Sequence, residues 1–117
     1  DYFASSKLNR EQSRAKNKET LMNIINDDKI ASADKKSAIK QVAAMTKISE
    51  KENAAETLLM AKGFSDPVVS ISSDKVDVVV NASSITDPQR AQIEDIVKRK
   101  TGISGVNIVI TPAAQTE

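Results

Sequence analysis

The sequence predicts an α+β fold, in which a helical N-terminal segment precedes elements in the order helix, strand, strand, helix, strand. Valines alternate with polar residues on both sides of a short turn in residues 68–81, a pattern typical of a β-hairpin. A helical stretch and a third strand follow, and such a strand–helix–strand crossover is right-handed with parallel strands. Two helices cover only one face of the resulting mixed sheet, so we expect its other face to be open.

The first element is a long polar helix. Residues 5–28 contain no Gly or Pro and are rich in helix formers. Residues 10–18 are almost wholly polar, so we expect the first half of this helix to be solvated and only the second half to pack. The packing side chains are Leu21, Met22, Ile24 and Ile25.

We interpret residues 1–30 as a helical stalk, residues 31–112 as the folded domain with its leading helix, and residues 113–117 as a flexible tail. Acidic residues interrupt the basic side chains of the stalk, which favours a solvated helix face over a contact with anionic lipid. These basic side chains are Arg10, Arg14, Lys16 and Lys18.

Two helices are expected before the hairpin. The first starts after Ser32, and we expect a break within residues 46–49. The next is predicted to start at Ser49, because Ser49 and Glu52 have the spacing of a capping box. Gly63 is the expected left-handed terminator, and Pro67 favours an extended entry to the first strand.

The hairpin register follows from the parity of its apolar residues. Pairing Ile71 with Val76 gathers the core residues on one face and leaves Ser73 and Asp74 as a two-residue loop. A four-residue loop remains an alternative, because Ser-Asp is not a preferred turn pair. The core residues are Val69, Ile71, Val76, Val78 and Val80. On the other face the same register pairs Val68 with Val79 and Ser70 with Asp77.

The last helix and strand complete the sheet. Asp87 is predicted as N-cap with Pro88 in the first helical position, and Gly102 ends the helix. Residues 106–112 form the third strand, with Val106, Ile108 and Ile110 facing inward. Asn107 and Val109 face outward.

The composition argues against catalysis. The chain has no Cys and no His, which excludes thiolate or imidazole zinc sites and the Ser-His-Asp triad, and we expect no cofactor or metal. Lys and Arg number 17 against 16 acids, so there is no overall field that would steer the chain onto nucleic acid. No apolar run approaches the roughly 20 residues of a membrane span.

The loop from Gly102 to Gly105 matches the GxxG pattern of KH domains, which clamps a nucleic-acid backbone, and the element order also resembles a KH core. A KH loop joins two helices, however, whereas this loop joins a helix to a strand. A KH-like nucleic-acid binding module is therefore the alternative interpretation, and an interaction domain is the preferred one.

The predicted interaction surface is the open face of the sheet together with one strand edge, since such surfaces pair readily with other chains. The alternative is that the N-terminal helices fold over this face and fill it. The candidate residues are Val68, Ser70, Asp77, Val79, Asn107 and Val109.

The stretches ADKKSAIKQVAAMTKISEKENAAETLLMAKGF and SDKVDVVVNASSITDPQRAQIEDIVKRKTGISGVNIVITP resemble the extracytoplasmic region of the SpoIIIAH family of sporulation proteins. The resemblance implies a membrane anchor before Asp1, in the mother-cell membrane around the forespore, with this region in the intermembrane space. It also implies binding to the forespore membrane protein SpoIIQ in a channel or feeding-tube assembly with other channel subunits.

The same resemblance extends to the ring-building domain of the type III secretion (YscJ/PrgK) and flagellar (FliF) ring proteins. In those proteins helix faces of one subunit pack against the sheet of the next, which generates a homo-oligomeric ring. That family has no catalytic residues to transfer. The resemblance therefore implies a non-enzymatic scaffold that links two membranes.

Overall fold

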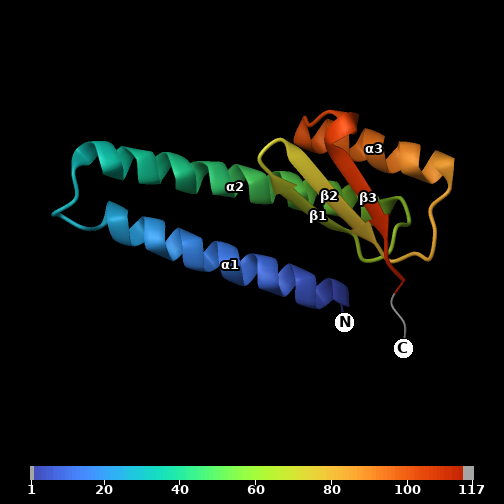
Figure 1. The fold of residues 1–117 in the computed structure, drawn as a ribbon, viewed down its shortest axis with the longest axis horizontal. Helices are drawn as coiled ribbons and strands as arrows, with labels where there is room; N and C mark the ends of the chain where they lie inside the picture. The colour runs from blue at the N-terminus through green and yellow to red at the C-terminus, as the bar shows by residue number, and fades with distance from the viewer. Residues whose placement is uncertain (1, 115–117) are drawn as a thin grey trace.

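The computed structural model describes residues 2–114, so that residues 115–117 of the predicted tail lie outside the described residues. Its elements, drawn in Figure 1, are α1 (Tyr2–Ile25), α2 (Ser32–Ala61), β1 (Val68–Ser72), β2 (Lys75–Val80), α3 (Asp87–Thr101), the 3₁₀ turn η1 (Gly105–Asn107) and β3 (Ile108–Pro112). The predicted α+β class is confirmed.

The molecule is elongated, with extents of 55 × 32 × 21 Å. Figure 1 shows α1 and α2 running antiparallel as a two-helix arm, while the sheet and α3 lie at one end of it. The turn between the two helices forms the far end of the arm, and the start of α1 lies beside the sheet. The N-terminal segment therefore folds back along α2.

The sheet has the predicted topology, with strand order β1-β2-β3, β1 antiparallel to β2 and β2 parallel to β3. The hairpin pairs Ile71 with Val76 and leaves a two-residue loop, as the parity of the apolar residues predicts. Ser73 adopts a left-handed conformation in this loop, with φ of 56°. The four-residue alternative is thus excluded.

Helix α2 is continuous over its 30 residues, so the predicted break at residues 46–49 is wrong. The Thr46 hydroxyl donates to the Val42 carbonyl at 3.1 Å, which satisfies it inside the helix. The predicted capping box is also wrong, because Ser49 lies within the helix and Glu52 has partners elsewhere in the chain. A Ser-x-x-Glu pattern caps a helix only where the Ser itself has non-helical backbone geometry, and Ser49 is helical here.

The end of α2 follows the prediction. Gly63 has φ of 97°, a left-handed conformation that glycine adopts without steric cost. Its N–H donates to the Met60 carbonyl at 3.0 Å, and the Phe64 N–H donates to the Leu59 carbonyl at 3.1 Å. This pair of bonds is the Schellman motif, which satisfies the last carbonyls of a helix.

Helix α3 starts one residue earlier than predicted. Thr86, rather than Asp87, is the N-cap: its hydroxyl accepts from the Gln89 N–H at 3.2 Å, and the Gln89 side chain accepts from the Thr86 N–H at 2.9 Å. The reciprocal bonds satisfy two amide groups, which a shift to Asp87 would forfeit. Gly102 ends the helix with φ of 77°, as predicted.

Strand β3 is shorter than predicted, because residues 105–107 form the turn η1. Val106 is 90% exposed and does not face inward, which corrects the prediction for this residue. Ile108 and Ile110 are buried as expected.

The core lies between the sheet and the helices α2 and α3, all on one face of the sheet. All five predicted hairpin core residues are buried. The core cluster comprises Ala55, Leu59, Val69, Ile71, Val76, Val78, Val80, Ile93, Ile96, Val97, Ile108 and Ile110.

Candidate interaction surface

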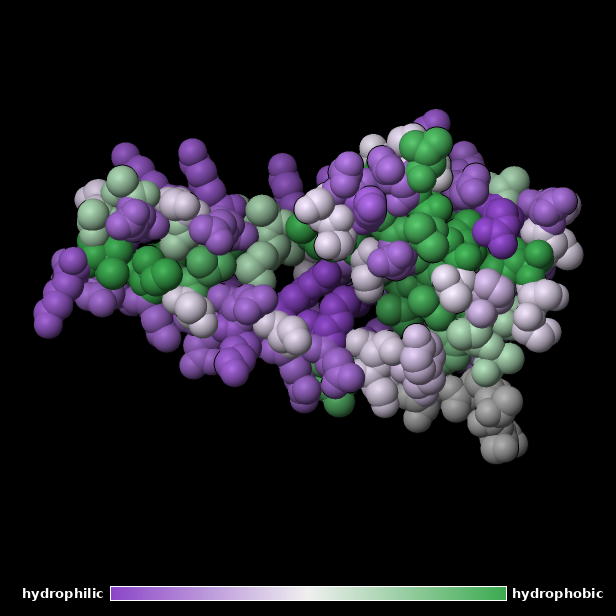
Figure 2. Space-filling model, viewed as in Figure 1, coloured by the Kyte–Doolittle hydropathy of each residue, from purple (hydrophilic) through white to green (hydrophobic). Residues whose placement is uncertain are grey.

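The outer face of the sheet is organised in rows set by the strand register. Asp77 pairs with Ser70 on one side and with Val109 on the other, so these three residues form the central row. Asp77 is exposed, Ser70 is half-buried, and Val109 is 51% exposed. Figure 2 shows hydrophobic side chains gathered over the sheet and a second group at the far end of the arm, whereas the middle of the arm is largely hydrophilic. The row therefore combines an exposed valine with polar side chains, a mixture that protein interfaces also have.

The neighbouring positions differ in accessibility. Val79 pairs with Val68 and Thr111 in the next row, where Val79 is half-buried but Val68 is only 5% exposed. Val68 lies outside the core cluster, and α1 contacts β1. Asn107 is half-buried in η1, beside the sheet. The chain itself therefore covers Val68, while the other five candidates remain at least partly accessible.

The free edge of β1 is closed by two carboxylates from α2. Glu56 Oε2 accepts from the Val69 N–H at 2.8 Å, and Glu52 Oε2 accepts from the Ile71 N–H at 2.7 Å. The Arg10 guanidinium of α1 donates to the Val69 carbonyl at 2.6 Å. These side chains take the positions that the backbone of an added strand would occupy, so strand addition at this edge is blocked.

The carboxylates are held in turn by cations from α1. Arg14 makes a two-point ion pair with Glu52, with Nη1 bonded to Oε1 and Nη2 2.8 Å from Oε2. Arg10 Nη1 lies 3.3 Å from Glu56 Oε2, and Lys7 Nζ lies 3.5 Å from Glu56 Oε1. We call these five residues the charge cluster. The hydrogen bonds between Arg14 and Glu52 raise the pKa of the Arg14 guanidinium above its ordinary value, although the partial burial of Arg14 lowers this pKa.

The charge cluster overturns the expectation that the first half of α1 is solvated. Phe3 is buried, and the Arg10 and Arg14 side chains are only 11% and 22% exposed. In the second half Leu21 and Ile24 are half-buried as predicted, whereas Met22 is exposed. Polar side chains mediate the packing of α1 because Glu52 and Glu56 are buried and need counter-charges.

The spacing of the acidic residues in α2 indicates that they pair with basic residues elsewhere in the chain. Glu52 and Glu56 are four apart and flank Ala55 on the buried face of α2, while Arg10 and Arg14 have the same spacing in α1. Acids on an apolar helix face predict a buried pairing partner. No pattern in the sequence identifies which of the 17 basic residues supplies it.

The edge of β3 is also poorly suited to strand addition. The Ala113 N–H donates to the Val80 carbonyl, so by alternation the backbone groups of Ile110 and Pro112 point to the outer edge. Pro112 has no N–H, and the Ile108 N–H is taken by the Gly105 carbonyl. Within β3, Ile110 therefore supplies the one outward donor, which leaves the outer face as the better contact surface.

The remaining sequence predictions concern a GxxG loop, a metal site and a membrane span. The loop from Gly102 to Gly105 joins α3 to η1, as expected from its place between a helix and a strand. Residues 2–114 contain no group of three or more Asp or Glu side chains that could hold a metal ion. Neither long helix of the arm has, within its described residues, an apolar stretch that could cross a bilayer.

Comparison with known proteins identifies the family. Residues 1–110 match the family described as SpoIIIAH-like protein. Stage III sporulation protein AH of Bacillus subtilis (strain 168) is 26% identical over 100 residues, which are 86% of this chain and 46% of that protein. The chain thus spans a little under half the length of this relative.

A solved structure shares the fold. A chain in the structure of the SpoIIQ–SpoIIIAH pore-forming complex superposes with a TM-score of 0.87 at 24% sequence identity, covering 98% of this chain and 99% of that one. The likeness includes the two-helix arm, because nearly the whole chain is aligned. Since the family match extends over residues 1–110 of 117, the chain belongs to the SpoIIIAH-like protein family.

Proposed function

We propose that this chain is the extracytoplasmic region of a non-enzymatic subunit of the channel between mother cell and forespore. In this role it binds a SpoIIQ-type forespore membrane protein across the intermembrane space. Family membership supports a role in sporulation. The observation that carries the proposal is the agreement in fold, at a TM-score of 0.87, with a chain of the SpoIIQ–SpoIIIAH complex.

The proposed contact surface is the outer face of the sheet. Both strand edges are unfavourable for pairing, since the charge cluster closes β1 and β3 presents one outward donor. The outer face combines the exposed Val109 with Asp77, Ser70, Val79 and Asn107. Apolar and polar groups are both usual at a protein interface, so a half-exposed valine beside Asp77 and Ser70 is compatible with this role.

A charge at Val109 tests this surface. Val109→Glu should raise the Kd for the SpoIIQ extracytoplasmic region at least tenfold in calorimetric titration, because binding would bury the new carboxylate. Met60→Glu on α2 is the matched control, since Met60 is 50% exposed and Val109 51%. It should leave the Kd within about twofold.

A second variant guards against unfolding of the first. Asp77→Arg changes an exposed polar residue of the same row and should weaken binding without lowering the melting temperature. Undiminished binding by both variants would show that the partner uses another surface.

We propose in addition that copies of the chain assemble into a ring. The resemblance to ring-building domains supports this arrangement. Light scattering with and without the SpoIIQ region is the test. Defined higher oligomers that appear with the partner support a ring, whereas a 1:1 complex at all concentrations supports a simple link between two membranes.

A further inference from the structure

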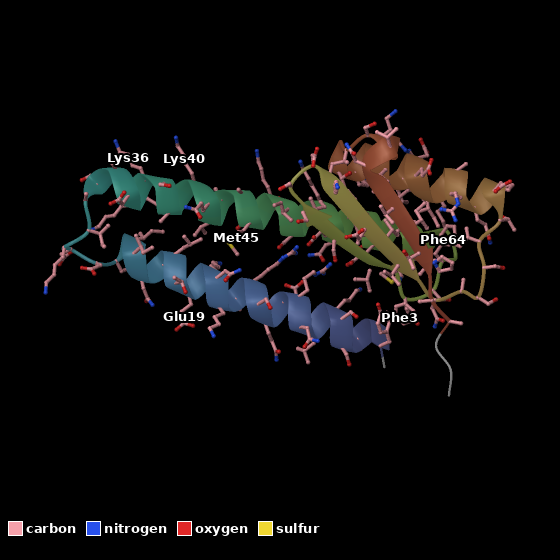
Figure 3. All side chains as sticks on the ribbon, in the orientation of Figure 1. Phe3, Glu19, Lys36, Lys40, Met45 and Phe64 are labelled. Atoms are coloured by element: carbon pink, nitrogen blue, oxygen red, sulfur yellow. The ribbon has the colours of Figure 1, made fainter. Side chains whose placement is uncertain are left out.

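Helix α2 carries a row of lysines on the side away from α1. Lys36 and Lys40 project from this side in Figure 3, while α1 lies on the opposite side of the helix. Lys47 and Lys51 continue the row toward the sheet, and all four lysines are exposed. We call these four residues the basic lane.

The lane is straight because of its spacing. At about 100° per residue, positions 36, 40, 47 and 51 fall within about 60° of one another around the helix. The successive steps of four, seven and four residues correspond to about 6, 10 and 6 Å along the axis. The spacing reads the same in both directions, so a partner helix could match it in either orientation.

The lane is not neutralised by the rest of the chain. Within residues 2–114, none of its four lysines lies within 4.0 Å of a carboxylate. By contrast, Arg10 and Arg14 on α1 are held by Glu52 and Glu56. Glu50 is the acid that helical geometry places closest to the lane; it lies within one turn of Lys47 and Lys51 and about 15 Å or more along the axis from Lys36 and Lys40. The surface therefore has a local positive potential that the net charge of +1 conceals.

An apolar groove lies at the sheet end of the lane. Ala54 is five helical turns from Lys36 and so lies on the same line, and Leu58 is half-buried one turn further on. Lys100 at the end of α3 adds a fifth ammonium beside the groove. The lining residues are Asn53, Ala54, Thr57, Leu58, Ala61 and Lys100.

We infer that the basic lane and this groove form a second docking surface, which binds an acidic helical segment of another protein. Carboxylates at matching spacing pair with the lysines, and one apolar side chain enters the groove. This surface goes beyond the proposed function, since it lies on α2 rather than on the outer face of the sheet. A helix that binds a bilayer inserts several large apolar side chains beside its lysines. Among the described residues of α2, Ile39 is the one exposed side chain of this kind next to the lane, and Ala43 and Ala44 stand between Lys40 and Lys47.

A synthetic peptide provides the test. The probe is a capped, fluorescein-labelled helical peptide with glutamates at steps of four, seven and four residues and a leucine about two turns beyond. Binding to the full chain is measured by anisotropy at 50 mM NaCl. Lys40→Glu/Lys47→Glu should raise the Kd at least tenfold. Lys16→Glu/Lys18→Glu, with the same charge change at exposed positions of α1, should change it less than twofold.

Two further measurements make the outcome decisive. Amide shifts of the ¹⁵N-labelled chain should move along α2 and at residue 100 when the peptide is added. Lys40→Gln/Lys47→Gln introduces no like-charge contact with the peptide and should raise the Kd about threefold. This variant replaces Lys40→Glu/Lys47→Glu if the charge-reversed chain fails to fold. Equal weakening by the α1 control, shifts located elsewhere, or lane-dependent binding only to vesicles with 30% phosphatidylglycerol would each overturn the inference.

Discussion

Replacing Glu52 by glutamine tests whether the charge cluster holds the arm against the sheet. The carboxylate of Glu52 is fully buried, accepts from the Ile71 N–H at 2.7 Å and pairs with Arg14 through both oxygens. Glutamine has the same shape but presents an NH₂ group to one of these donors and carries no charge. The substitution therefore leaves a guanidinium without its counter-ion and one donor facing another donor.

The expected cost follows from these contacts. Breaking a fully buried pair by removing one partner costs about 3–5 kcal/mol. Arg14 retains 22% exposure and regains some hydration, so we expect about 3 kcal/mol for Glu52→Gln. For a chain of this size that corresponds to a fall in melting temperature of roughly 10 °C.

Urea unfolding followed by circular dichroism at 222 nm measures this cost. Glu50→Gln, an exposed position on the same helix, is the control and should lie within about 0.5 kcal/mol of the wild type. A double-mutant cycle of Glu52→Gln with Arg14→Gln should give a coupling energy above about 1 kcal/mol. Wild-type stability for Glu52→Gln, or a coupling energy near zero, would refute the reasoning.

Two more substitutions test local features of the fold. Arg14→Lys should destabilise the chain by about 1–2 kcal/mol at pH 7, because an ammonium cannot form two parallel bonds to a carboxylate. Because the pKa of the Arg14 guanidinium is raised in the folded chain, the contribution of the Arg14–Glu52 pair is fully present up to the ordinary arginine pKa and is constant between pH 7 and pH 11. A lysine at this position begins to lose its proton at about pH 10, so the gap in stability between the wild type and the lysine variant should widen above that pH. A constant gap in urea midpoints between pH 7 and pH 11 would contradict this. Thr86→Ala should cost about 1 kcal/mol in the same assay by removing the N-cap of α3, whereas Thr57→Ala, exposed within α2, should be nearly neutral; equal effects would refute the capping assignment.

The hairpin could be predicted from the sequence because its information is local. Side chains alternate with a period of two, so a one-residue slip of the register would break the common face of Val69, Ile71, Val76 and Val78. Among the registers that keep this face, the one with a two-residue loop is the shortest hairpin. The parallel placement of β3 followed from the handedness of crossovers, which applies to nearly all folds. These elements needed no knowledge of distant contacts.

The arm could not be predicted because its contacts are long-range. Ser49 and Glu52 have the spacing of a local cap, yet Glu52 bonds to Arg14 and Ile71, which are 38 and 19 residues away. A carboxylate with a buried cation and a strand amide as partners gains more than one at a helix start. The ion pairs from α1 to α2 are long-range as well, so the sequence pattern predicts a solvated first half of α1 although Arg10 and Arg14 are largely buried there. Which residues of the outer sheet face contact a partner stays a prediction.

The two carboxylates on the edge of β1 also fix the axial position of α2. Four residues of helix span about 6.0 Å, and two residues of strand span about 6.6 Å, so the two spacings nearly coincide. Glu52 meets Ile71 and Glu56 meets Val69, which requires helix and strand to run in opposite directions. A slip of α2 by one turn would leave one strand amide without its carboxylate. The two hydrogen bonds therefore fix how far the arm extends beyond the sheet. The turn at the far end of the arm keeps a constant distance from any protein that binds the sheet.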